Sequence, residues 1–192
     1  INGNLTETES IIIARILIEY QPERIFEIGT FNGRTTMNIA MNTNENAKIF
    51  TLDLPLQKRA ETKYRTSKHE RGYINKKNKP LVFLNYQDIK RKIQPLYGDS
   101  ATFDITPFEE SIDMIFIDGS HTYEYVLNDT QLALKLLRPS GGIILWHDYN
   151  SATYTGVNRA LIKLRSEIES LKNIKNIMGT SLAFADTRNL QK

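Results

Sequence analysis

Two aspartates and two histidines stand at spacings that suit acid–base or metal chemistry. His121 follows Asp118 by three residues, and His147 directly precedes Asp148. Each pair lies at the end of a short apolar segment, 112–118 or 143–146. Carboxylate oxygens and imidazole nitrogens bind divalent metal ions, and an imidazole with a pKa of about 6.5 can accept a proton at neutral pH. The two pairs therefore predict a metal site, a general base, or both.

For the metal site we expect Asp118 and Asp148 as ligands, with His147 as a third. Adjacent parallel strands lie about 4.8 Å apart, so groups that end neighbouring strands can reach one ion. Mg²⁺ needs only one or two carboxylates, because water and substrate oxygens complete its shell. A histidine in the set shifts the preference toward manganese, iron or zinc. Since successive strand residues point to opposite faces, His147 could instead pack away from the site.

Acidic residues also end other apolar segments, and one of them adjoins a glycine loop. The loop Glu27-Ile-Gly-Thr-Phe-Asn-Gly33 has two glycines four residues apart, but Phe31 stands where a dinucleotide fingerprint needs its second glycine. A P-loop would need Gly-Lys-Ser/Thr, which is absent. The loop therefore predicts a ligand without phosphates. Asp53, 24 residues after Gly29, is placed to accept hydrogen bonds from two ribose hydroxyls.

The elements that would position these residues alternate along the chain. We expect helices at 11–20, from about 33, at 81–92, 122–137 and 157–171, and strands at 24–28, 48–53, 93–97, 112–118 and 143–146. Residues 174–185 are typical of a hairpin that turns near Gly179. This order predicts an α/β fold: a Rossmann-like, doubly wound, mostly parallel seven-stranded sheet with helices on both faces and a C-terminal antiparallel hairpin. Ligands of such sheets bind at the carboxyl ends of the strands, where the acids lie.

Length and composition predict one domain over residues 1–192. The chain has a net charge of +3 and no cysteine, which excludes thiol nucleophiles, thiolate zinc sites and disulfides. The absence of cysteine fits a reducing compartment, so we expect a cytoplasmic protein. No apolar run approaches the ~20 residues of a membrane span, and no membrane partner is expected. Because the first residue is Ile, we expect a piece of a longer protein.

An insertion at 57–92 separates the second and third predicted strands, and its first part is strongly basic. Residues 57–80 carry nine Lys or Arg and two Glu, whereas the rest of the chain is slightly acidic. Such a run is often only a solvated helix face. Alternatively it binds an anionic acceptor such as a nucleotide sugar, or a nucleic acid, with Tyr64 and Tyr73 stacking on bases.

Two regions of the chain resemble a known family. Phe26-Glu-Ile-Gly-Thr-Phe-Asn-Gly-Arg-Thr35 resembles the first motif of the class I S-adenosylmethionine-dependent methyltransferases, and Leu52-Asp53 resembles their ribose-binding acid. Three later stretches are similar to the branch with cephalosporin-hydroxylase-like proteins and antibiotic-sugar O-methyltransferases: Asp113-Met-Ile-Phe-Ile-Asp-Gly-Ser-His-Thr-Tyr123, Leu136-Leu-Arg-Pro-Ser-Gly-Gly142 and Trp146-His-Asp-Tyr149. The resemblance spans 22–186, and its second half is the more specific.

The resemblance implies S-adenosylmethionine as cofactor and a divalent metal, Mg²⁺ first. In the family the glycine loop holds the methionine part of the cofactor, and the third strand's end holds the adenine. The implied cofactor-binding residues are Glu27, Gly29, Thr30, Gly33, Asp53, Leu54, Gly98, Asp99, Ser100 and Asp118. Asp99 and Ser100 could equally cap a helix. His121 resembles the family's proposed base, with a metal-bound hydroxide or alkoxide as the rival route. The sugar enzymes use three acidic ligands, and His147 departs from that set.

The leading hypothesis is therefore metal-assisted O-methylation of a hydroxyl on a small molecule, such as a sugar or another vicinal diol. The alternatives are an RNA methyltransferase that uses the basic insertion as a clamp, and a non-catalytic cofactor-binding module. An NAD-dependent oxidoreductase is disfavoured because the fingerprint glycine is absent. A homo-oligomer is compatible with all of these.

Overall fold

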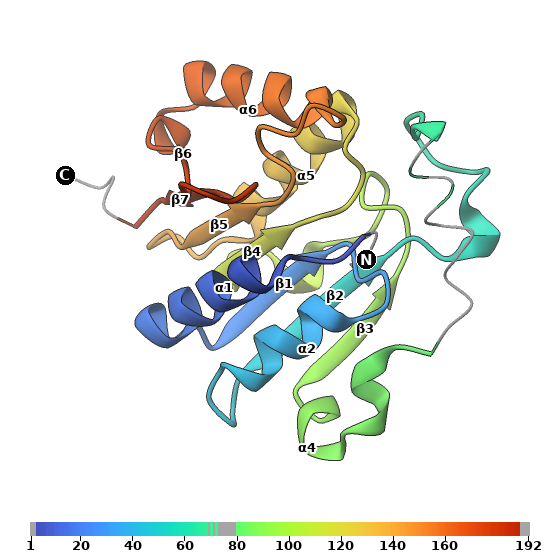
Figure 1. Ribbon diagram of the computed structural model, residues 1–192, viewed down its shortest axis with the longest axis vertical. Coiled ribbons are helices and arrows are strands. Elements are labelled where there is room, and N and C mark those ends of the chain that lie inside the picture. The colour runs from blue at the N-terminus through green and yellow to red at the C-terminus, as the bar shows by residue number, and fades with distance from the viewer. Residues whose placement is uncertain (1–2, 69, 71, 73–79, 189–192) are drawn as a thin grey trace.

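The computed structural model describes residues 3–68, 70, 72 and 80–188, and in these the predicted fold class is confirmed. The parallel strands are β1 (Arg24–Ile28), β2 (Lys48–Asp53), β3 (Ile93–Tyr97), β4 (Met114–Ile117) and β5 (Ile143–Trp146). The hairpin strands β6 (Lys175–Asn176) and β7 (Ala183–Asp186) are antiparallel. The order across the seven-stranded sheet is β3-β2-β1-β4-β5-β7-β6 (Figure 1).

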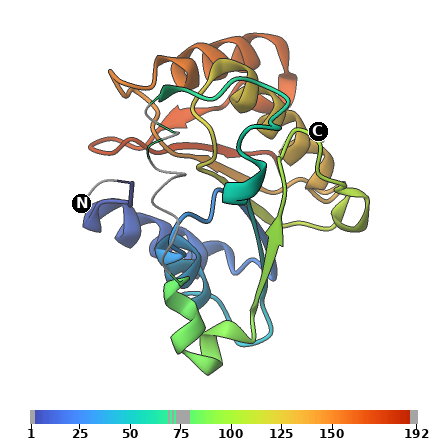
Figure 2. The ribbon, with the colours of Figure 1, turned by 90° about the vertical axis from the view of Figure 1, so that its right-hand side faces the viewer.

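Helices cover both faces of the sheet. One layer holds α1 (Glu7–Tyr20) and α2 (Arg34–Met41), and the other holds α5 (Tyr123–Leu136) and α6 (Thr155–Glu167) (Figures 1 and 2). Alternate residues of each strand enter opposite cores: Ile25 packs with α1 and α2, whereas Phe26 packs with α5 and α6. Because both faces are buried, a ligand has access to the sheet only at the strand ends.

Helix α1 begins four residues earlier than the predicted 11–20 because it has a capping box. The Thr6 hydroxyl accepts a hydrogen bond from the Glu9 amide (3.2 Å), and Oε2 of Glu9 accepts one from the Thr6 amide (2.9 Å). These bonds satisfy backbone donors that the first turn leaves unpaired. They also hold Glu9, which is only 3% exposed, against the interior.

The predicted helix at 81–92 is wrong. A 3₁₀ helix, Val82–Asn85, and the short helix α4 (Gln87–Lys90) replace it, with Tyr86 extended between them. The Val82 amide donates to the Asn32 carbonyl (3.0 Å), and the Phe83 ring is fully buried in the core beside the glycine loop. Docking onto that loop therefore outweighs the helical pattern.

Two other predicted elements are shorter than expected. Helix α6 ends at Glu167 and a 3₁₀ turn, Glu169–Leu171, follows it. Strand β4 covers only 114–117 of the predicted 112–118. Oδ2 of Asp113 accepts hydrogen bonds from the backbone amides of Glu23 and Arg24, so its side chain holds the first residues of β1.

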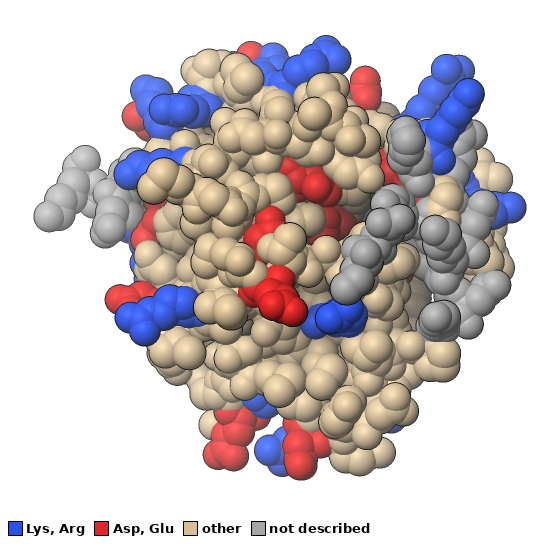
Figure 3. Space-filling view, viewed as in Figure 1, with Lys and Arg blue, Asp and Glu red and all other residues tan. Residues whose placement is uncertain are grey.

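The described part of the insertion packs on the domain. A 3₁₀ helix, Leu56–Lys58, opens it, and the Tyr64 ring meets the Tyr125 ring edge-on at 5.4 Å. Tyr64 is thus turned toward the protein, and Tyr73 lies outside the described residues. Basic side chains stand out at the upper right of Figure 3, over the insertion, while acidic ones gather nearer the middle.

In the described part of the chain, no helix has the length and apolarity to cross a membrane.

Lys92 ties α2 to the sheet. Its ammonium donates to the carbonyls of Ala40 (2.7 Å) and Thr43 (2.9 Å), which end α2 and its following turn, and Lys92 is 9% exposed. We expect Lys92→Met to lower the free energy of unfolding by about 1–3 kcal/mol, because two carbonyls lose a charged donor. Chemical denaturation measures this. The exposed control Lys90→Met should change it by less than about 0.5 kcal/mol, and equal losses would contradict the assignment.

Candidate functional site

A pocket of about 260 Å³ opens at the carboxyl ends of the parallel strands. It gathers most of the residues that the sequence singled out, from five separate strand ends. Those that line it are Gly29, Asp53, Leu54, Gly98, Asp99, Ser100, Asp118, His121, His147 and Asp148. Glu27, Thr30 and Gly33 are not among the lining residues.

The glycine loop shapes one wall of this pocket. Gly29 has a φ of +102°, and a Cβ there would lie 2.1 Å from the backbone oxygen of Asp118. Only glycine allows β1 and β4 to come this close where they end. Phe31 also has a positive φ, 50°, and lines the pocket.

Glu27 lies behind the loop and is fully buried. Its Oε2 accepts hydrogen bonds from the hydroxyls of Thr36 and Thr51, each at 2.5 Å, while Oε1 has no partner among the described residues. Burial, with a smaller contribution from the charges of Asp118 and Asp53, raises the pKa of Glu27 to about 8. The carboxyl is therefore neutral at physiological pH and links α2 to β1 and β2.

At the end of β3, the carboxylate of Asp99 is already occupied. Oδ1 accepts hydrogen bonds from the Ala101 amide (3.0 Å) and the Tyr125 hydroxyl (2.9 Å), and Oδ2 accepts one from the Lys63 amide (2.8 Å). No helix begins directly after Asp99 in the described residues, so its side chain closes a turn rather than capping a helix, and its role toward the cofactor stays a prediction. The same contacts anchor the insertion to the pocket.

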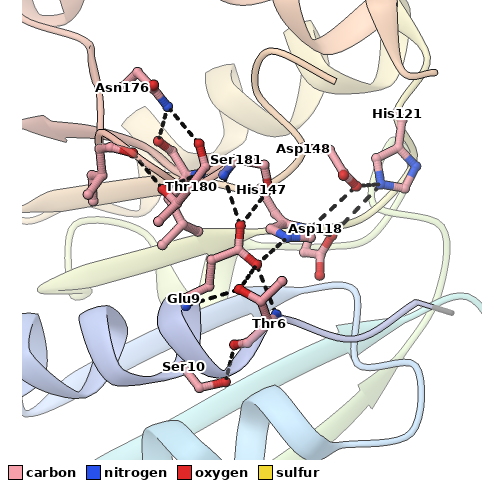
Figure 4. A network of polar contacts seen from close by, with 12 residues as sticks. Thr6, Glu9, Ser10, Asp118, His121, His147, Asp148, Asn176, Thr180 and Ser181 are labelled. Carbon is pink, nitrogen blue, oxygen red and sulfur yellow. Dashed lines mark hydrogen bonds and ion pairs between the residues drawn. The ribbon is translucent and has the colours of Figure 1, made fainter. Parts of the chain in front are cut away.

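Four side chains form a ring at the ends of β4 and β5 (Figure 4). Nδ1 of His147 lies 3.1 Å from Oδ1 of Asp118 and 3.4 Å from Oδ2 of Asp148. Nε2 of His121 lies 2.8 Å from the same Oδ2 and 3.8 Å from the same Oδ1. His147 therefore faces the site rather than packing away from it. Asp118, His147 and Asp148 each offer a ligand atom within 4.8 Å of the others, a spacing suited to a metal ion.

Two further carboxylates contact the histidines from outside the ring. Oε2 of Glu9 lies 3.5 Å from Nε2 of His147, and Oε1 of Glu70 lies 3.2 Å from Nδ1 of His121. Tyr154 stacks on the His121 ring with the centroids 4.1 Å apart. Sequence reasoning missed all three residues. Glu9 carried the signal of a capping box, but no local pattern connects Glu70 or Tyr154 with His121.

The acids dominate the electrostatics of the ring. Burial opposes a charge on His147, but Asp118, Asp148 and Glu9 outweigh it and raise the pKa of His147 well above its usual value. In the same way Asp118, Asp148 and Glu70 raise the pKa of His121. Burial likewise opposes charge on the acids, yet the two histidines lower the pKa values of Asp118 and Asp148. Without another cation, the acids hold both imidazoles protonated.

This sheet order, with a glycine loop and an acidic pocket at the strand ends, defines a class I methyltransferase fold. Residues 26–149 match a family model described as a methyltransferase domain, and the chain belongs to this family. The resemblance found in the sequence is thereby confirmed at the level of the class. An uncharacterised protein of Acanthamoeba polyphaga mimivirus is 36% identical over 90 residues, which are 46% of this chain. The chain spans only 38% of that relative's length.

Solved structures with the same fold include several with a bound cofactor. Cofactor-bound Rv0187 from MTB has a TM-score of 0.67 at 18% identity, covering 98% of this chain and 83% of that one. The O-methyltransferase TomG from Streptomyces achromogenes, in complex with SAM, has 0.63 at 18%, covering 96% and 82%. An O-methyltransferase from Bacillus cereus, in complex with SAH, has 0.63 at 17%, covering 97% and 84%. At such identities the likeness shows a shared fold.

The buried acid behind the glycine loop predicts how stability depends on pH. Because the folded state keeps the Glu27 proton up to about pH 8 and the unfolded chain releases it near 4.5, wild type loses stability as pH rises between these values. Glu27→Gln keeps an oxygen for both threonines and cannot ionise. We expect it to match wild type near pH 5 and to exceed it at pH 9 by up to about 4 kcal/mol.

Thermal and chemical unfolding at the two pH values measure this difference. A gap between Glu27→Gln and wild type that is the same at pH 5 and pH 9 would show that the carboxyl does not change its protonation on unfolding.

Proposed function

We propose that this domain binds S-adenosylmethionine and transfers its methyl group to a hydroxyl oxygen of a small molecule, with a divalent ion holding that hydroxyl. The proposal rests on one observation: a single pocket is lined both by Asp53, an acid suited to ribose, and by the possible metal ligands Asp118, His147 and Asp148. The family, whose members are methyltransferase domains, supports the reaction. TomG and the Bacillus cereus protein, both O-methyltransferases, support an oxygen as acceptor.

The β1–β2 side of the pocket suits the cofactor. Asp53 ends β2 and lines the pocket next to the apolar side chains of Leu52, Leu54 and Phe31. An ionised carboxylate can accept hydrogen bonds from both ribose hydroxyls, while apolar walls exclude water from the adenosine. Gly29 and Gly98 bring backbone close to the same space. This fits a nucleoside without phosphates, and we assign the methionine part to the glycine loop as the resemblance implies.

The β4–β5 side suits a cation. Asp118, His147 and Asp148 would hold it, and a buried nitrogen without an aligned hydrogen bond, Nε2 of His121, faces the same ring. A bound divalent ion would supply a lowered pKa and a fixed orientation for a substrate hydroxyl. A vicinal diol offers two oxygens to such a site, which is why a sugar or a similar polyol is the acceptor we favour.

The transfer breaks the carbon–sulfur bond of the sulfonium and forms a carbon–oxygen bond. The products are a methyl ether, S-adenosylhomocysteine and one proton. Asp53 and the glycine loop orient the donor, and the ring orients the acceptor, so the reacting atoms meet in line. The base expected from the sequence is His121, whose Nε2 lies 2.8 Å from Oδ2 of Asp148 and must lose its own proton before it can accept that of the substrate.

The alternatives lose support. An RNA clamp relied partly on Tyr64, which packs against Tyr125 instead. A pure binding module needs no ring of acids and histidines beside its cofactor pocket. Cytoplasmic location and homo-oligomerisation remain predictions.

Calorimetric titration of S-adenosylmethionine, with and without Mg²⁺ or Mn²⁺, tests the proposal. We expect saturable binding to wild type and at least about 10-fold weaker binding to Asp53→Ala, which loses charge-assisted hydrogen bonds. The double variant Asp118→Ala/Asp148→Ala should lose the response to the ion. The exposed acid Asp104, outside the pocket, gives the control Asp104→Ala. Failure of wild type to bind would remove the cofactor and the reaction built on it.

A further inference from the structure

We propose that His121 is a fourth metal ligand and that the pocket therefore binds a first-row transition-metal dication in preference to Mg²⁺. The inference deepens the proposed function and rests on it. The acceptor site would then be built from two carboxylates and two imidazoles: Asp118, Asp148, His147 and His121.

The first support is the spacing of the four ligand atoms. Ligands bound at about 2.1 Å lie about 3.0 Å apart when neighbouring in an octahedron and about 3.4 Å apart in a tetrahedron. The contacts around the ring are 3.1, 3.4, 2.8 and 3.8 Å. They run from His147 to both aspartates and from His121 to the same two oxygens. Asp118 and Asp148 thus each contact both imidazoles. The three ligand atoms that all lie within 4.8 Å of one another are those of Asp118, His147 and Asp148, so His121 completes the set when its ring moves toward the ion.

The second support is the orientation of His121. Its Nε2 is buried and has no aligned hydrogen bond, although Oδ2 of Asp148 is only 2.8 Å away. A buried ring nitrogen that makes no aligned hydrogen bond is costly and rare in folded proteins. Coordination of a metal ion would give this nitrogen the partner that the geometry of the ion pair with Asp148 does not supply.

The third support is the carboxylate behind each imidazole. His147 turns Nδ1 into the ring and Nε2 toward Glu9, whereas His121 turns Nε2 into the ring and Nδ1 toward Glu70. Metal-binding histidines almost always donate their other ring N–H to a carboxylate or carbonyl, which fixes the tautomer. Both histidines show this arrangement, with opposite nitrogens facing inward.

The outer carboxylates are themselves held in place. Oε1 of Glu9 accepts hydrogen bonds from the amide (2.9 Å) and hydroxyl (2.7 Å) of Ser181, and Oε2 accepts those of Thr6. Glu70 accepts hydrogen bonds from the Ser67 amide (2.5 Å), the Ser120 hydroxyl (3.0 Å) and the His121 amide. Glu9 is 3% and Glu70 5% exposed. Two distant segments therefore fix the two imidazoles.

The donor set decides the class of metal. Mg²⁺ prefers oxygen ligands and keeps several waters, whereas imidazole nitrogens suit zinc, iron, cobalt and nickel. A single histidine leaves the choice open, but two imidazoles beside two carboxylates favour the transition metals. A base role for His121 makes a different prediction, since removing a free base leaves metal affinity unchanged.

Titration of the metal-stripped chain with ZnCl₂, CoCl₂ and MgCl₂ measures the preference. We expect Zn²⁺ and Co²⁺ to bind on the order of 100-fold more tightly than Mg²⁺. Glu70→Gln, which leaves all four ligands in place, should weaken Zn²⁺ binding by about 10-fold. Asp104→Ala, which removes an exposed acid outside the pocket, is the control and should bind Zn²⁺ like wild type. Equal affinities for Mg²⁺ and Zn²⁺ would overturn the preference.

Nitrogen-15 NMR of histidine-labelled wild type separates a metal ligand from a free base, because it reports the state of each ring nitrogen. On adding Zn²⁺ we expect His147 to be bound through Nδ1 with its proton on Nε2, and His121 through Nε2 with its proton on Nδ1. His121→Gln and His147→Gln assign the signals. An Nε2 of His121 that does not respond to Zn²⁺, while His147 does, would overturn the fourth ligand.

The two proposals can fail separately. S-adenosylmethionine titrated into metal-stripped wild type reports only the cofactor side. Zn²⁺ coordination without any cofactor binding would leave the metal site standing and remove the methyltransferase proposal. Cofactor binding with no Zn²⁺ coordination would do the reverse.

Discussion

Negative charge at one buried edge of the sheet is the constraint on which the rest of the structure depends. Asp118 and Asp148 face each other across the ends of β4 and β5, and Glu9 and Glu70 approach from outside. Ionised carboxylates are costly to bury together unless cations compensate them. The two imidazoles provide that compensation, and the neighbouring acids raise the pKa values of both. A bound dication would replace two protons with the same total charge, held directly by the carboxylates and imidazoles.

This constraint explains why distant segments meet here. Helix α1 contributes Glu9 through a capping box, so one side chain both starts the helix and supports His147. The insertion contributes Glu70, one of only two glutamates in its strongly basic first part. The net charge of that segment suggested an anionic partner, which stays a prediction. Its contact with His121, in contrast, is made by one of its few acids.

The sequence predicted what local pattern controls. Apolar runs that end in an acid gave the five parallel strands, and parallel topology then placed Asp53, Asp118 and Asp148 in one pocket. The helix expected at 81–92 failed because burial of Phe83 beside the glycine loop overrides local periodicity. The partners of His121 were beyond prediction for a related reason: Glu70 reaches it across 51 residues, through packing that no spacing encodes. Glu27 matches a motif acid, yet it is buried behind the loop and does not line the pocket, so its assignment to the cofactor stays a prediction.

The insertion also connects the two ends of the pocket. It binds Asp99 through the Lys63 amide and the His121 loop through Glu70. Asp99 thus holds the insertion and the Tyr125 hydroxyl as well as bordering the cofactor space. Loss of activity in an Asp99 variant would therefore not by itself assign the residue to adenine, because the ring formed by Asp118, His121, His147 and Asp148 would lose a support at the same time. Among the strand-end acids, Asp53 lines the pocket without belonging to that ring, so it is the better probe of the proposed cofactor binding.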